Sequence, residues 1–239
     1  MCGIVGLYLK NPLLEDRLGA LFSPMLIEMT DRGPDSAGFA IYGDEVADGY
    51  VKISLQQHTD KNFSWKNFAV WLTEKLGEEV VLSENATAAV IRVKTTESAA
   101  RRLIEHNFSD LRIMSIGRSI EIRKEMGLPQ VVSDRFGLPD LRGTHIIGHT
   151  RMATESAVTT EGSHPFSTGM DLCLVHNGSL SNHNRLRSWL ERQNINFKTV
   201  IPMFGETIPY FFWLKKNLVK NEGNEWIFTK IELCVDLNS

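Results

Sequence analysis

Cys2 follows the initiator methionine and opens an apolar run that extends to Leu7. Removal of Met1 would make this cysteine the N-terminal residue and would give it a free α-amine. Such an amine titrates near ~8 and a free thiol near ~8.5, so the amine can accept the thiol proton directly or through one water. One residue would then supply both the nucleophile and the base. The simpler interpretation of Cys2 is a small residue at the buried start of a strand.

Three further segments have the residue types of an amide-hydrolysing site. Segment 32–38 is rich in Gly and Pro and could cover a bound substrate, although an ordinary turn has the same composition. Arg151 ends an apolar strand, where its planar fork could hold a carboxylate; a surface ion pair is the alternative. Asn177 and Gly178 could point a side-chain NH₂ and a backbone N–H at one oxyanion, although Asn-Gly is also the commonest hairpin turn.

Taken together and in this order, these segments resemble the class II glutamine amidotransferases. Members of this family hydrolyse glutamine to glutamate and deliver ammonia to a synthase partner. The resemblance implies that Cys2 is the nucleophile, that it forms a γ-glutamyl thioester, and that its freed amine is the general base. Arg151 matches the arginine that binds the α-carboxylate of glutamine, and Asn177 and Gly178 match the oxyanion-hole donors.

The resemblance also implies which residues surround the glutamine. Arg32 and Gly33 fall in what resembles the loop that closes over the substrate. Thr154 and His164 match positions that line the pocket. Met152 stands where several relatives have tryptophan, so the gating of ammonia release is expected to differ.

The sequence departs from the family where the α-ammonium of glutamine is bound. Relatives use the aspartate of an Asp-x-Glu motif downstream of the oxyanion asparagine, and this motif is missing from the window 199–207. Glu206 is the only carboxylate there. It either replaces the aspartate or corresponds to the glutamate of the motif, in which case Phe204 occupies the aspartate position. An ammonium facing an apolar wall would lose a charge-assisted hydrogen bond, worth roughly 1.5–3 kcal/mol.

Within the family, segments 115–124, 135–138 and 144–156 look most like the stand-alone amidotransferase subunits related to glutamate synthase, including that of N-methylglutamate synthase. This resemblance implies no cofactor in this chain and a flavin-containing synthase partner that could carry FMN and iron–sulfur clusters. We expect one amidotransferase domain over residues 2–239, with a long insertion at about 44–144. Because the family fold continues well beyond Glu206, we also expect a truncated C-terminus.

Hydrophobic periodicity predicts the elements that must position these residues. An opening strand over residues 3–9 leads to a helix over about 18–29, which Pro24 either kinks or begins. Further strands are predicted over residues 37–42, 50–55, 88–93, 145–150 and 172–175, and further helices around residues 65–76, 97–111 and 182–193. Strands and helices alternate only loosely, which favours an α+β fold over a doubly wound parallel sheet. The family resemblance implies a four-layer α/β/β/α sandwich of the N-terminal-nucleophile hydrolase type.

Composition excludes several classes of partner. The chain has 239 residues, 42% of them hydrophobic, and a net charge of −3 with 26 dispersed basic residues, which argues against nucleic-acid and membrane-surface binding. No apolar run approaches the ~18 residues of a membrane span. The three cysteines, Cys2, Cys173 and Cys234, are too far apart for a Cys-rich zinc site. We therefore expect a cytoplasmic protein whose partners are L-glutamine and a synthase subunit.

Three other interpretations stay open at this point. The chain could be a catalytically impaired or truncated relative that acts as a binding or scaffolding subunit. It could also be an N-terminal-nucleophile hydrolase for another amide. The third alternative is a metal-binding protein that uses His145, His149, His164 and His176, although three of these histidines lie inside motifs that are explained otherwise.

Overall fold

The computed structural model describes residues 2–57, 63–85, 87–153 and 158–177 together with Ser188 and Arg192. Within these residues the chain forms two four-stranded antiparallel sheets and a two-stranded hairpin. The first sheet has the order β1-β8-β2-β7 and consists of β1 (Gly3–Tyr8), β8 (His145–Arg151), β2 (Ser36–Tyr42) and β7 (Ile120–Met126). The second sheet has the order β4-β5-β3-β6 and consists of β4 (Val81–Asn85), β5 (Ala88–Lys94), β3 (Tyr50–Gln57) and β6 (Leu111–Gly117). The hairpin consists of β9 (Phe166–Gly169) and β10 (Leu172–Leu174).

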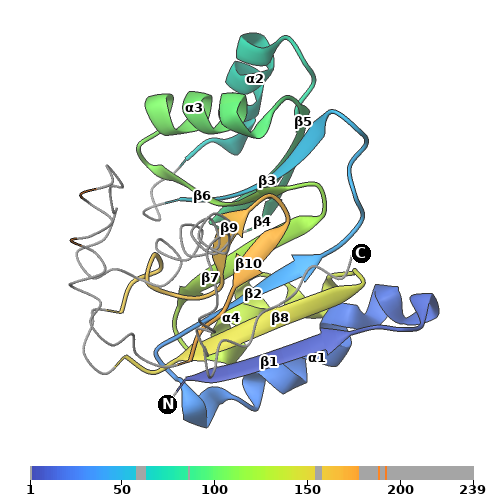
Figure 1. Ribbon diagram of the computed structural model, residues 1–239, viewed down its shortest axis with the longest axis vertical. Coiled ribbons are helices and arrows are strands. Elements are labelled where there is room, and N and C mark those ends of the chain that lie inside the picture. Colours follow the sequence, from blue (N-terminus) through green and yellow to red (C-terminus); the bar gives the residue numbers. More distant parts are fainter. Residues whose placement is uncertain are drawn as a thin grey trace, which may run out of the picture.

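Helices cover one face of each sheet (Figure 1). On the first sheet, Phe22 of α1 (Leu18–Ile27) and Phe136, which follows α4 (Pro129–Arg135), are buried with Phe39 of β2. On the second sheet, Phe68 of α2 (Trp65–Leu76) and Ile104 of α3 (Glu97–Asn107) are buried with Ile53 of β3. Short 3₁₀ helices complete the layer on the first sheet and the loops near it: η1 (Pro12–Arg17), η2 (Thr30–Arg32) and η3 (Leu138–Asp140). Figure 1 shows α2 and α3 at one end of the molecule and α1 at the other, with the strands between them.

Local sequence signals set the ends of α2 and α3. Ser64 precedes α2 and Thr96 precedes α3. Each side-chain oxygen accepts a hydrogen bond from the backbone N–H three residues later, which belongs to Asn67 and Ala99 respectively. These are N-caps, which satisfy backbone donors that have no partner within the helix. Gly77 ends α2 with a φ of 68°, in the left-handed region that glycine adopts without strain.

The inner face of the first sheet, defined by Ala40, Ile122 and Ile147, packs against Met114 of the second sheet and Cys173 of the hairpin. Buried charges also lie between the two sheets. Lys52 of β3 donates hydrogen bonds to the carbonyls of Asp44 and Ser119, and its Nζ lies 3.4 Å from the carboxylate of Glu121. These partners compensate for the desolvation of the ammonium, which would otherwise be costly.

Asp171 docks the β9–β10 hairpin onto the turn between β6 and β7. Its carboxylate accepts hydrogen bonds from the backbone N–H groups of Arg118, Ser119 and Ile120 at 2.8–3.0 Å. The chain continues from this hairpin to Asn177.

The structure confirms the α+β class and the predicted strands within residues 3–175. Of the two alternatives for Pro24, a helix start is wrong, because α1 begins at Leu18 and continues through the proline. α3 ends at Asn107 rather than residue 111, because the backbone leaves the helix at Phe108 and β6 begins at Leu111. The segment 44–144 supplies β3 to β7 and α2 to α4. The helix expected around 182–193 lies outside the described residues, apart from two isolated positions.

Across the described part of the chain, no helix combines the length and the apolar character needed to cross a membrane.

Candidate active site

Three neighbouring strands of the first sheet bring Cys2, Arg151 and Ser36 to one end of that sheet. The register of β1 with β8 pairs Gly3 with Thr150, and the register of β8 with β2 pairs Arg151 with Ser36. Cys2 precedes Gly3 and therefore lies opposite Arg151 in the continuing register. Because side chains alternate along a strand, all three point to the inner face of the sheet.

Asn177 joins Cys2 at this end of the sheet. Its side-chain Nδ2 donates a 2.8 Å hydrogen bond to the Cys2 carbonyl, and the Cys2 Sγ lies 3.9 Å from the carbonyl of Met152. The thiol residue is partly exposed. A side-chain NH₂ carries two protons, so Asn177 can hold the Cys2 backbone with one and still donate the other to a bound group. The sequence prediction that Cys2 and Asn177 belong to one site is therefore consistent with this geometry.

The loop that contains Arg32 and Gly33 packs against the backbone of Arg151. A Cβ at Gly33 would come within 2.5 Å of the Arg151 nitrogen, so only glycine fits there. The N–H of Asp35 donates to the Arg151 carbonyl at 3.0 Å, and the Asp35 carboxylate accepts from the N–H of Ala153 at 2.7 Å. Arg32 is exposed at the end of η2, whereas Arg151 is buried.

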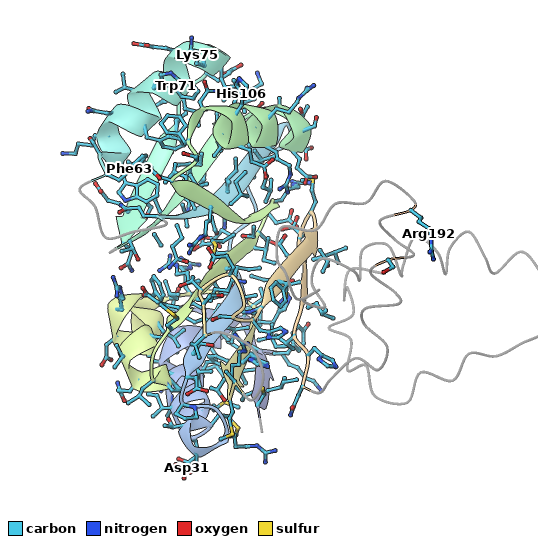
Figure 2. All side chains as sticks on the ribbon, turned by 90° about the vertical axis from the view of Figure 1, so that its left-hand side faces the viewer. Asp31, Phe63, Trp71, Lys75, His106 and Arg192 are labelled. Atoms are coloured by element: carbon cyan, nitrogen blue, oxygen red, sulfur yellow. The ribbon has the colours of Figure 1, made fainter. Side chains whose placement is uncertain are left out.

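This loop lies far from the helices of the second sheet. Figure 2 shows Asp31, the neighbour of Arg32, at one end of the molecule and Trp71 and His106 of α2 and α3 at the other.

His149 and His164 form a buried pair one row further along the inner face. Their ring centroids are 4.2 Å apart, and His149 Nε2 donates a 2.9 Å hydrogen bond to the carbonyl of His176, the neighbour of Asn177. Burial lowers the pKa of His149 to about 4 and the pKa of His164 well below its ordinary value. Both rings are therefore neutral at pH 7. Through His176, this pair helps to hold the segment that carries Asn177.

Sequence reasoning missed two residues that shape the site, Asp35 and Lys124. Asp35 stands in a loop whose composition suggested only a turn, and its role is to link two backbone segments. Lys124 is a buried lysine that donates to carbonyls of the segment that carries His164. Neither contact has a sequence signature, because both involve backbone groups.

Three predicted site residues, Thr154, Gly178 and Glu206, lie outside the described residues. Among residues that the structure does describe, no group of three or more His, Cys, Asp or Glu side chains could hold a metal ion.

The chain is similar in sequence to several known proteins. No protein-family model matches the chain. The glutamine amidotransferase-like protein GlxB of Rhizobium meliloti (strain 1021) is 51% identical over 200 residues, which are 83% of this chain and 65% of that protein. A protein of Methanothermobacter thermautotrophicus, named provisionally as a glutamine amidotransferase, is 32% identical over 209 residues, 83% of this chain and 68% of that protein. The chain thus spans about two thirds of the length of these relatives.

A more distant match covers less of the chain. The glutamine–fructose-6-phosphate aminotransferase of Sulfurisphaera tokodaii is 32% identical over 106 residues, 44% of this chain and 18% of that protein. The two longer matches extend across most of the chain, and the match to the Methanothermobacter protein covers 68% of that protein. The chain therefore belongs to the glutamine amidotransferase family.

Proposed function

We propose that this chain is the glutamine-hydrolysing part of a class II amidotransferase and converts L-glutamine to L-glutamate and ammonia through a thioester on Cys2. The hydrogen bond from the Asn177 side chain to the Cys2 carbonyl, 2.8 Å long, carries the proposal. It supports the proposal because an amide donor next to Cys2 could stabilise the oxyanion that forms during acyl transfer to sulfur. Membership of the family supports glutamine as the amide that is cleaved.

The reaction begins after Met1 has been removed. The α-amine of Cys2 accepts the thiol proton, and the sulfur attacks the side-chain carbonyl carbon of glutamine. Asn177 and Gly178 donate to the resulting oxyanion. When the tetrahedral intermediate collapses, the C–N bond breaks and ammonia leaves with the proton that the amine held. Water, deprotonated by the same amine, then attacks the thioester, which releases glutamate and restores the thiol.

Further residues orient the substrate in this proposal. Arg151 binds the α-carboxylate, and its backbone contacts with the loop of Arg32 and Gly33 support a role for that loop as a cover. Thr154 and His164 line the pocket. Glu206 is the candidate counter-charge for the α-ammonium.

The proposal extends to the fold and to the fate of the ammonia. We assign the two sheets and their helices to a four-layer α/β/β/α sandwich of the N-terminal-nucleophile hydrolase type. Ammonia passes to a synthase partner, such as a glutamate-synthase-like flavoprotein that carries FMN and iron–sulfur clusters. Because free ammonia would be lost to solvent, the amidotransferase works beside that partner, in the cytoplasm.

A glutaminase assay with a matched pair of cysteine variants tests this function. Cys2→Ala should abolish the formation of glutamate from glutamine, whereas Cys173→Ala should leave turnover within about threefold, because Cys173 belongs to β10 and its side chain is buried in an apolar cluster. Mass spectrometry must show that Met1 is absent. If the processed chain does not turn over glutamine, the binding or scaffolding subunit becomes the better interpretation. Turnover that survives in Cys2→Ala would assign the nucleophile elsewhere.

A further inference from the structure

Lys124 lies on the inner face of the first sheet, in the row next to Arg151. The registers of β8, β2 and β7 set His149, Gly38 and Lys124 side by side across the three strands. The missing side chain of Gly38 leaves room for another segment. A Cβ at this position would come within 2.3 Å of the His164 carbonyl oxygen and 2.4 Å of the Lys124 Cβ. The segment 161–165 thus rests directly on the sheet between His149 and Lys124.

The ammonium of Lys124 holds this segment through its backbone. Nζ donates to the carbonyl of Ser163 at 2.6 Å and to that of Pro165 at 3.0 Å, and the carbonyl of Glu161 lies at 3.5 Å. The ammonium also lies 4.3 Å from the centre of the Phe166 ring. Three N–H donors therefore meet three carbonyls of one segment, and the residues on either side of His164 supply the two shorter bonds.

We propose that Lys124 is a positioning residue for the glutamine site, because its ammonium fixes the segment 161–165 and with it the ring of His164 against His149. This inference rests on the proposed function, in which His164 lines the pocket. Lys124 is buried and acts through the segment that it holds.

Two charged side chains and two histidine rings lie around the ammonium. Glu161, in the same segment, forms an ion pair with Arg112 of β6, while the rings of His149 on β8 and His164 are neutral. Burial lowers the pKa of Lys124 to about 7; the charge of Glu161 opposes this shift and the charge of Arg112 adds to it. A neutral residue at position 124 would leave Glu161 paired with Arg112. Loss of the carbonyl contacts would then be the main consequence of the substitution.

Lys124→Met tests the proposal, with Lys52→Met as the matched control. Both substitutions remove a buried ammonium that donates to backbone carbonyls, but Lys52 contacts the turn at Ser119 and the Asp44 carbonyl, beyond the end of β2 opposite to Ser36. At ~3.3 Å per residue, the length of β2 separates the two ends by about 20 Å. The first readout is hydrogen exchange of the peptide 158–170. The second is the KM and the kcat for glutamine, measured with variants whose thermal unfolding remains cooperative.

The two readouts separate the inference from the proposed function. We expect Lys124→Met to speed exchange in residues 158–170 and to raise the KM about tenfold or more while kcat changes less. Lys52→Met should do neither. Unchanged exchange in Lys124→Met, or faster exchange with an unchanged KM, would overturn the positioning role. If Lys124→Met speeds exchange but the wild-type chain does not hydrolyse glutamine, the backbone contact is supported. The proposed function and the role of Lys124 in it are then both refuted. If Lys124→Met does not fold, Lys124→Arg takes its place in the test. Lys124→Arg should preserve the wild-type exchange rate of residues 158–170, and faster exchange in this variant would also count against the role.

Discussion

At the scale of single residues, Arg151 and Asn177 differ in burial and in the hydrogen bonds that hold them. Arg151 is buried at the end of a strand, and its carbonyl accepts a hydrogen bond from Asp35. Asn177 is exposed, and its side chain is held by the 2.8 Å bond to Cys2. In the proposed mechanism, Arg151 binds the α-carboxylate of the substrate, whereas Asn177 donates to the oxyanion.

Arg151→Lys should weaken glutamine binding. Lysine keeps the positive charge but cannot form the two parallel hydrogen bonds that a guanidinium makes with a carboxylate. Loss of one charge-assisted hydrogen bond, worth roughly 1.5–3 kcal/mol, corresponds to a rise in KM of about 10- to 100-fold. Steady-state kinetics would measure it. A fall in kcat at unchanged KM would contradict the assignment of Arg151 to the substrate carboxylate.

Asn177→Asp should instead slow the chemical step. The two side chains have the same shape, but the carboxylate has no N–H to donate and carries a charge that repels the oxyanion. We expect kcat to fall on the order of 10²–10³, with a smaller change in KM. Single-turnover measurement of thioester formation would isolate the step. Thioester formation at the wild-type rate would exclude Asn177 as an oxyanion donor.

At the scale of elements, the sequence predicts six of the ten strands in the described residues, including β3 with its buried Lys52, and misses β4, β6, β7 and β9. β8 is a largely apolar run that ends at Arg151, so both the strand and the candidate carboxylate-binding arginine can be found by pattern. β7 was not predicted, because Arg123 and Lys124 interrupt its apolar pattern although both are buried. They donate hydrogen bonds to the backbone carbonyls of Phe136, Ser163 and Pro165. Because every residue has a backbone carbonyl, the sequence does not indicate these partners.

The close approach of the segment 161–165 to β2 makes Gly38 a sensitive position. Gly38→Ala places a Cβ 2.3 Å from the His164 carbonyl oxygen, so either the strand or the segment must move. We expect a loss of about 1–3 kcal/mol in the free energy of unfolding, as for other overpacked sites. Urea denaturation would measure this loss.

Gly6→Ala in β1 is the matched control for Gly38→Ala. The nearest atom to a Cβ at Gly6 is the Ile146 carbonyl oxygen at 3.7 Å, an ordinary contact. The control should therefore lose less stability than Gly38→Ala. Equal losses would mean that the substitution acts through backbone conformation rather than through contact with the segment.

At the scale of the whole molecule, the buried histidine pair couples stability to pH. Burial lowers the pKa of His149 from its ordinary 6.5 to about 4 and lowers that of His164 well below 6.5. Between pH 4 and 6.5 the unfolded chain therefore binds more protons than the folded chain. Stability should rise with pH through this window and fall on acidification, and a shift of the size of the His149 shift is worth roughly 3 kcal/mol.

Histidine variants separate this effect from the titration of carboxylates. His149→Gln should flatten the increase in unfolding free energy between pH 4.5 and 6.5, whereas His106→Gln, at an exposed position on α3, should keep the wild-type slope. Urea denaturation at several pH values would give both slopes. An unchanged slope in His149→Gln would show that this ring titrates equally in the folded and unfolded chains.

The central claim is that Cys2 is a nucleophile inside an assembled glutamine site. Peptide mass spectrometry after exposure to a diazo-ketone analogue of glutamine tests it most directly, because the analogue alkylates a thiol only from within such a site. We predict one adduct, on an N-terminal Cys2 that has lost Met1, with Cys173 and Cys234 unmodified. A chain that has lost Met1 but keeps an unmodified Cys2 would contradict the claim.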